Sequence, residues 1–183
     1  MYKLMIIVVS VLLASTVAFG ANSPISKGSL KIDGSVGFSS TGGDYYHSRV
    51  TVFSLEPSVG AFVADGLLIG GSVALTSASG GGESITAWGM GPSLAYYFKG
   101  GNATRDIKGS VYPFVGASFM VTGASGGGSS ASGTGFAFAG GIKYMITQTV
   151  ALNTAASYSI STMESLSTNV FGISAGFSFF IWE

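Results

Sequence analysis

Hydrophobic residues alternate with small residues along most of the chain. Near the C-terminus every second position is apolar, at Phe171, Ile173, Ala175, Phe177, Phe179 and Ile181, and the positions between are mainly glycine and serine. A period of two is that of a β-strand, whose successive side chains point to opposite faces. The alternation recurs around 30–38, 136–144 and 150–160, and no window has a convincing helical period.

Turn-forming segments divide the chain into eight predicted strands. We place them near 28–40, 49–62, 67–76, 85–98, 110–122, 134–145, 149–160 and 168–182. Gly/Ser-rich or polar loops are expected near 41–48, 77–84, 123–133 and 161–167, and shorter turns alternate with them. The low-complexity 123–133 segment is most simply a flexible loop. Most of these strands exceed the roughly 9–11 residues that a tilted strand needs to cross a bilayer.

The first 20 residues have the layout of a cleavable signal peptide. Lys3 precedes an apolar run from Leu4 to Phe19, and the small residues Ala18 and Gly20 mark a cleavage site after Gly20. The run is shorter than the roughly 20 residues of a membrane-spanning helix, which favours cleavage over anchoring. We expect residues 1–20 to be a signal peptide, 21–27 a short periplasmic segment and 28–183 the folded domain.

Composition decides which face of the strands meets solvent. Only 9% of the residues are charged, and the face opposite the apolar one carries Gly, Ser, Ala and Thr. Such a face would serve poorly as a water-exposed surface, whereas small residues suit a narrow interior with the apolar face in lipid. Because backbone groups in hydrocarbon must all be paired, the strands must close. We predict an all-β, eight-stranded, antiparallel up-and-down transmembrane barrel; the alternative is a soluble ligand-binding barrel with its apolar face inside.

Two stretches carry a resemblance to a known family. The run from Pro57 to Gly70 and the segment from Tyr112 to Gly116 resemble the second hairpin and fifth strand of small outer-membrane β-barrels of the OmpA and OmpX type. The resemblance implies the outer membrane of a Gram-negative-type bacterium, with outer-membrane lipid and the insertion machinery as partners. The chain departs from the family's aromatic ending, because Glu183 follows Trp182.

Three prolines lie inside the predicted strands. Pro57, Pro92 and Pro113 each lack the N–H that a ladder needs, so each requires a bulge or a non-bonding position. All three fall on the predicted lipid face. They leave the strand registers around them open.

Charged residues with inward parity are predicted to form an interior polar cluster. Lys31 and Lys143 balance Asp33 and Glu56 near the short-turn end, and buried charges need partners. Bulky inward residues fall at the same end, among them Tyr97, Tyr112 and Phe180. We interpret the four charges as a structural salt-bridge network that plugs the periplasmic half, below a shallow cup; the functional alternative is a proton or ion path.

Other chemistry has little support in the sequence. The net charge of zero argues against a nucleic-acid partner, and the absence of cysteine excludes thiolate chemistry. His47, with Asp44 and Ser48, lies in one polar loop, and a solvated loop histidine is favoured over a catalytic one. Asp44, Glu83 and Glu164, in three outer loops, are more plausibly solubilising than cation-binding. We therefore expect no cofactor, no metal and no catalytic residues.

Three functions follow from this architecture. The first is a non-enzymatic integral outer-membrane protein with a structural or surface-interaction role and an unknown surface ligand. The second is a narrow pore for small solutes, which a plugged interior opposes. The third, a lipid A-modifying enzyme, depends on His47.

Overall fold

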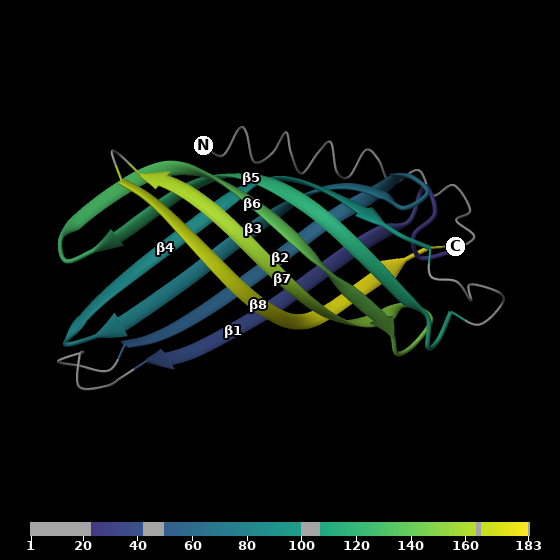
Figure 1. Ribbon diagram of the computed structural model, residues 1–183, viewed down its shortest axis with the longest axis horizontal. Coiled ribbons are helices and arrows are strands. Elements are labelled where there is room, and N and C mark those ends of the chain that lie inside the picture. Colours follow the sequence, from purple (N-terminus) through teal and green to yellow (C-terminus); the bar gives the residue numbers. More distant parts are fainter. Residues whose placement is uncertain (1–22, 42–49, 100–106, 164–165, 183) are drawn as a thin grey trace.

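Eight antiparallel strands form a closed barrel in chain order (Figure 1). The computed structural model describes residues 23–41, 50–99, 107–163 and 166–182. The strands are β1 (Leu30–Thr41), β2 (Val50–Ala64), β3 (Leu67–Gly80), β4 (Glu83–Tyr97), β5 (Val111–Gly126), β6 (Ser129–Met145), β7 (Val150–Met163) and β8 (Leu166–Ile181). The described residues contain no helix long and apolar enough to cross a membrane. The predicted signal peptide, 1–20, lies outside them.

The apolar face of the barrel points outward, as the composition of the two faces predicts. Phe171, Ile173 and Phe177 are exposed, whereas Ser178 and Phe180, at the alternate positions of β8, are buried. Five aromatic residues near the strand ends are also exposed on this outer face: Tyr96, Phe98, Tyr144, Phe177 and Phe179. The soluble alternative, with the apolar face inside, is therefore wrong.

Two Gly/Ser-rich segments predicted as loops extend the strands instead. The hairpins β3–β4 and β5–β6 close on the pairs Gly81–Gly82 and Gly127–Gly128, whose φ values are 64°, 86°, 58° and 82°. Two consecutive positive φ values are the requirement of a tight two-residue hairpin turn, which glycine meets without steric cost. The expectation of a flexible 123–133 loop is wrong, because β5 and β6 pair as far as Gly126 and Ser129.

The same correction applies to the loop predicted at 161–167. Met163 of β7 pairs with Leu166 of β8, so the strands leave only residues 164–165 between them. The loop predicted at 41–48 falls almost wholly outside the described residues.

Two of the three prolines interrupt a ladder without shifting its register. Pairing of β2 with β3 stops at Leu55–Leu75 and resumes at Ser58–Ser72, on either side of Pro57. Pairing of β4 with β5 likewise skips Pro92. The third, Pro113, stays opposite Ile142 in the β5–β6 register. The one register shift between β2 and β3 lies between Phe62 and Ala64.

One end of the barrel, which we call the base, holds its hydrophobic core. The base is the end with the β2–β3 and β6–β7 turns, and the opposite end, with the two Gly-Gly turns, is the rim. Eight apolar residues are buried together at the base: Ile25, Phe62, Leu68, Tyr97, Tyr112, Met145, Ala151 and Phe180. The rings of Phe62 and Tyr97 meet edge to face at 5.3 Å.

The segment before β1 joins this core. Gly28 N donates to Phe62 O over 2.9 Å, Phe62 N donates to Ser29 O over 2.8 Å, and Gly66 N donates to Ile25 O over 2.8 Å. Ile25 is consequently only 1% exposed. Residues 23–29 therefore pack into the base.

Candidate functional site

Three of the four predicted interior charges meet inside the barrel. Lys31 and Asp33 stand two positions apart on β1, and both point inward because a strand alternates. Lys143 reaches Asp33 from β6, with 3.1 Å between Nζ and Oδ1, and Lys31 Nζ is paired with Asp33 Oδ2. The side chains of Lys31, Asp33 and Lys143 are 6%, 15% and 2% exposed. One carboxylate thus holds two buried ammonium groups.

Neutral side chains complete the hydrogen bonding of both lysines. Lys31 Nζ donates to the Tyr97 hydroxyl over 2.7 Å, and Lys143 Nζ donates to Ser178 Oγ over 2.6 Å. Asn153 Nδ2 also donates to Ser178 Oγ, over 3.1 Å. Each ammonium group lies 5.2 Å from the centroid of an aromatic ring, as Lys31 does over Tyr97. Such partners offset the cost of removing charge from water, and they tie together β1, β4, β6, β7 and β8.

Glu56 lies apart from these three charges. It faces the interior from β2, but it is exposed, and its Oε2 accepts a hydrogen bond from Ser35 Oγ over 3.4 Å. Among the described residues, no ion pair joins Glu56 to a lysine. The buried trio therefore has a formal charge of +1, and the compensating carboxylate stands nearer the rim, in the accessible part of the interior.

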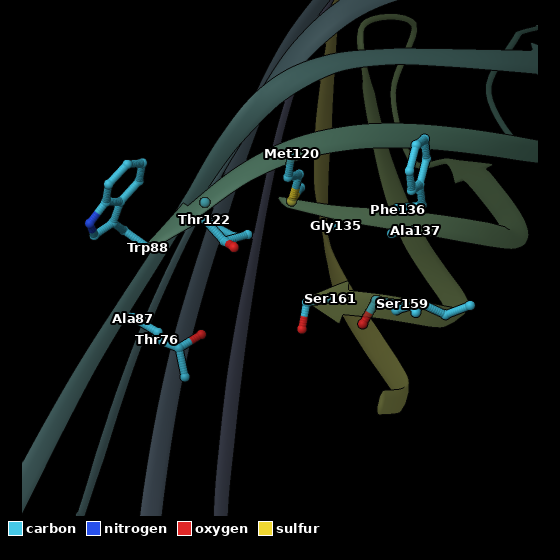
Figure 2. A pocket seen from close by; sticks show the side chains of 13 residues that line it. Thr76, Ala87, Trp88, Met120, Thr122, Gly135, Phe136, Ala137, Ser159 and Ser161 are labelled. Atoms are coloured by element: carbon cyan, nitrogen blue, oxygen red, sulfur yellow. The ribbon is translucent and has the colours of Figure 1, made fainter. Parts of the chain in front are cut away.

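The rim half of the interior contains a cavity of about 170 Å³. Its inward-facing lining consists of small or uncharged residues from β3 to β7: Ala74, Thr76, Ala87, Gly89, Met120, Thr122, Gly135, Ala137, Ser159 and Ser161. Figure 2 shows Thr76, Thr122 and Ser161 directed into a common space, whereas the rings of Trp88 and Phe136 extend away from it. We call this space the cup, and no charged residue in the described part of the chain lines it.

Sequence reasoning missed several residues that pack beneath the charges. Ile25 lies in the segment expected to be a periplasmic extension, and Phe62 and Met145 were not assigned to the interior. The sequence holds one available signal for Ile25, because it is a lone apolar residue among Ser, Pro, Lys and Gly. Phe62 follows the inward parity of Ser58 and Gly60, so that parity could have found it.

A second ion pair lies at the base, outside the barrel wall. Asp65, in the β2–β3 turn, accepts a hydrogen bond from the backbone N–H of Lys27 over 3.1 Å, and Lys99 Nζ approaches it to 3.3 Å. The Lys27 hydrogen bond, helped by the Lys99 ammonium group, lowers the pKa of the Asp65 carboxyl from its ordinary value of 3.8. This contact joins the segment 23–29 to the turn.

Most residues of the catalytic and cation-binding alternatives lie outside the described part of the chain. His47, Asp44, Ser48 and Glu164 lie outside the described residues, and of Glu83 only the backbone belongs to them. Within the described part of the chain, no group of three His, Cys, Asp or Glu side chains is arranged to hold a metal ion.

Comparison with known proteins decides the family. Residues 7–179 match the family described as the outer membrane protein beta-barrel domain. The chain belongs to this family. It is therefore an outer-membrane β-barrel protein of a Gram-negative-type bacterium. None of the curated proteins compared with this chain matches it.

Solved structures show the same fold. Neisserial surface protein A aligns with a TM-score of 0.57 and 21% identity, over 82% of this outer-membrane barrel and 95% of that chain. The N-terminal β-barrel domain of Pseudomonas aeruginosa OprF gives a TM-score of 0.56 and 14% identity, over 85% and 98%. OprG of the same organism aligns with a TM-score of 0.56 and 16% identity, over 88% of this chain and 100% of that chain.

Proposed function

We propose that this protein is a non-enzymatic outer-membrane barrel with a structural or surface-interaction role, and that its interior is closed on the periplasmic side. The observation that carries the proposal is the double layer at the base. Lys31, Asp33 and Lys143 pair across the interior, and beneath them the buried core fills the same end. Outer-membrane lipid surrounds the exposed apolar face, and the insertion machinery places the barrel there.

The composition of the base argues against a pore. A conducting pore needs a continuous polar path, and the side chains of Phe62, Tyr97 and Phe180 replace water at the base with apolar packing. The ions of the trio are held by each other and by the hydroxyl groups of Tyr97 and Ser178. The narrow pore is therefore the alternative function, and a conductance measurement distinguishes it from a closed barrel.

Planar-bilayer recordings test the closure directly. We expect the purified barrel to give no steady unit conductance. A variant with Phe62→Ala and Phe180→Ala, which removes two rings stacked 6.4 Å apart, should be leakier than the parent barrel. Steady unit conductance of the parent barrel would contradict the closure and favour the pore.

Two further measurements test the rest of the proposal. The folded barrel should migrate differently on a gel before and after heating, in the outer-membrane fraction of cells, and recovery in the soluble fraction would contradict membrane residence. The second measurement tests whether the protein modifies lipid A. Lipid A from cells with the His47→Ala variant should have the same mass spectrum as lipid A from cells with the parent protein. A changed spectrum would favour the lipid A-modifying enzyme.

A further inference from the structure

The barrel is incompletely joined where its first and last strands meet. The β1–β8 ladder begins at Leu30–Ile181 and ends at Val36–Ala175, although β1 continues to Thr41 and β8 begins at Leu166. In Figure 1 the yellow β8 follows the purple β1 near the base and then curves away from it toward the rim. We call this unpaired stretch, residues 37–41 with 166–174, the seam.

Exposure of the outward side chains marks the same place. Ile173, Phe38 and Phe171 are 76%, 73% and 68% exposed, and no other large hydrophobic residue on the described surface exceeds 57%. Phe38 and Ile173 are opposite each other in the register that the ladder would have if it continued. The ladder does not extend to these three residues, so they form an apolar border along the seam, which we call the lips.

The cup and the seam lie at one level of the barrel. Ser159 and Ser161 of the cup pair with Val170 and Thr168, which belong to the unpaired part of β8. The cup is lined by β3 to β7, and none of the described side chains of β8, β1 and β2 takes part in its lining. Because the strands form a ring, the side of the cup without a lining is the side on which the seam lies.

The chemistry of the seam and the cup suits one class of molecule. Unpaired backbone at membrane depth persists only where it borders protein or a water-filled cavity, and the free edges of β1 and β8 direct their N–H and C=O groups into the seam, beside the cup. Thr122 Oγ1, also in the cup, is buried and has no hydrogen-bond partner within the described residues. The lips, by contrast, are wholly apolar. A ligand with a polar end and a hydrocarbon chain is therefore favoured, with the polar end in the cup and the chain between the lips.

We propose that the seam admits a single-chain amphipathic lipid, such as a fatty acid, from the membrane into the cup. Its polar end lies against the cup hydroxyls and the free strand edges, and its chain leaves between Phe38 and Ile173. A volume of about 170 Å³ holds the end of one chain and is well below the roughly 300 Å³ at which pockets for larger ligands begin. If the base is closed, as the proposed function has it, a lipid can leave the cup only through the seam or the rim.

Locking the seam tests this proposal. The chain has no native cysteine, so Gly37→Cys with Ser174→Cys places two thiols at the first unpaired register position on the inner face. They are joined by oxidation, or by a short cross-linker that itself contains a reducible disulfide where direct oxidation is incomplete. The matched control is Val36→Cys with Ala175→Cys, a pair that the ladder already holds together.

The readout is photolabelling in phosphatidylcholine vesicles that contain a fatty acid with a diazirine near its carboxyl end. In the open barrel we expect label on the inward residues Met120 and Thr122 as well as on the outward residues Phe119 and Val121. Locking the seam should reduce the inward label about tenfold, a change of 1.4 kcal/mol, and leave the outward label unchanged. Reduction of the disulfide should restore the inward label in the same protein, which excludes misfolding.

Two results would overturn the proposal. Inward label that persists in the locked barrel would mean that the probe enters by the rim, and a lack of inward label in the open barrel would mean that the cup takes no such lipid. The control pair should leave the inward label at its parent level. The base is unaltered in every variant, so these outcomes are independent of the conductance test.

Discussion

Lys143 and Asp33 are 110 positions apart in the sequence, and their side chains meet in the middle of the barrel at 3.1 Å. The contact joins β6 to β1, two strands that share no ladder. It therefore adds a cross-barrel tie to a wall that is otherwise held by neighbouring strands. Asp33 is the shared partner of Lys31 and Lys143, so its carboxylate has the largest electrostatic role in the base.

Replacing Asp33 with asparagine should destabilise the barrel more than any other single change in the trio. The variant leaves two buried ammonium groups without their carboxylate, and breaking a buried pair in this way costs about 3 kcal/mol. Urea unfolding in vesicles, followed by the heat-modifiable gel shift, measures the change. Glu56→Gln is the matched control, because Glu56 is exposed and hydrogen-bonded to Ser35 at 3.4 Å; its effect should stay below about 1 kcal/mol. Equal losses for the two variants would contradict the assignment.

Replacing Lys143 with methionine should cost less than Asp33→Asn. Methionine keeps much of the buried stem volume, and the remaining Lys31–Asp33 pair is formally neutral. We expect a loss of about 1 kcal/mol, chiefly from the unsatisfied Ser178 and Asp33 oxygens. The same unfolding experiment tests the order, and a larger loss for Lys143→Met than for Asp33→Asn would show that Asp33 is not the shared partner.

Gly91→Ala should strain the β4–β5 pairing beside Pro92. A Cβ added at Gly91 would run into the Phe119 carbonyl oxygen, which is backbone and cannot rotate away. Overpacking of this kind costs about 1–3 kcal/mol. Gly34→Ala is the control, because nothing lies within 4 Å of a Cβ at that position. Unfolding midpoints that fall equally for the two variants would contradict the close approach.

Acid should loosen the segment 23–29 from the base. Because the pKa of Asp65 is lowered in the folded protein, its contribution to docking is present above the ordinary value of 3.8 and is lost as the pH falls through the lower folded value. Hydrogen exchange at Lys27, whose N–H donates to Asp65 at 3.1 Å, should rise at neutral pH in Asp65→Asn relative to the parent. In that variant exchange should respond less to acid than in the parent, beyond the ordinary pH dependence of exchange. Protection at Lys27 that is the same in both proteins would show that the carboxylate does not hold the segment.

The period of two, together with the turn segments and the scarcity of charge, was sufficient to predict the strand count and the outward face. Phe171, Ile173 and Phe177 alternate with small residues whatever the fold around them, so their common face is encoded locally. The hairpins at Gly81–Gly82 and Gly127–Gly128 were harder to predict from the sequence, because runs of Gly and Ser suit both a flexible loop and a tight turn. Only the ladder partners decide between the two.

The membership of the buried trio depends on information that a single strand does not contain. Asp33 and Glu56 have the same inward parity and the same charge, so the sequence predicts both in the cluster. The stagger of the closed barrel places Asp33 beside Ser178 and level with Lys143, and places Glu56 opposite Ser35, nearer the rim. Burial of Ile25 likewise depends on a turn, at Gly66, that is distant in sequence.

Spin labels along β8 would show whether the apolar face of the barrel lies in lipid. Single cysteines from 171 to 177, in a chain that has none of its own, would each carry a nitroxide in vesicles. We predict that accessibility to oxygen, which concentrates in lipid, peaks at 171, 173, 175 and 177 and falls at 172, 174 and 176. An inverted pattern, or one without a period of two, would contradict the barrel's placement in the membrane.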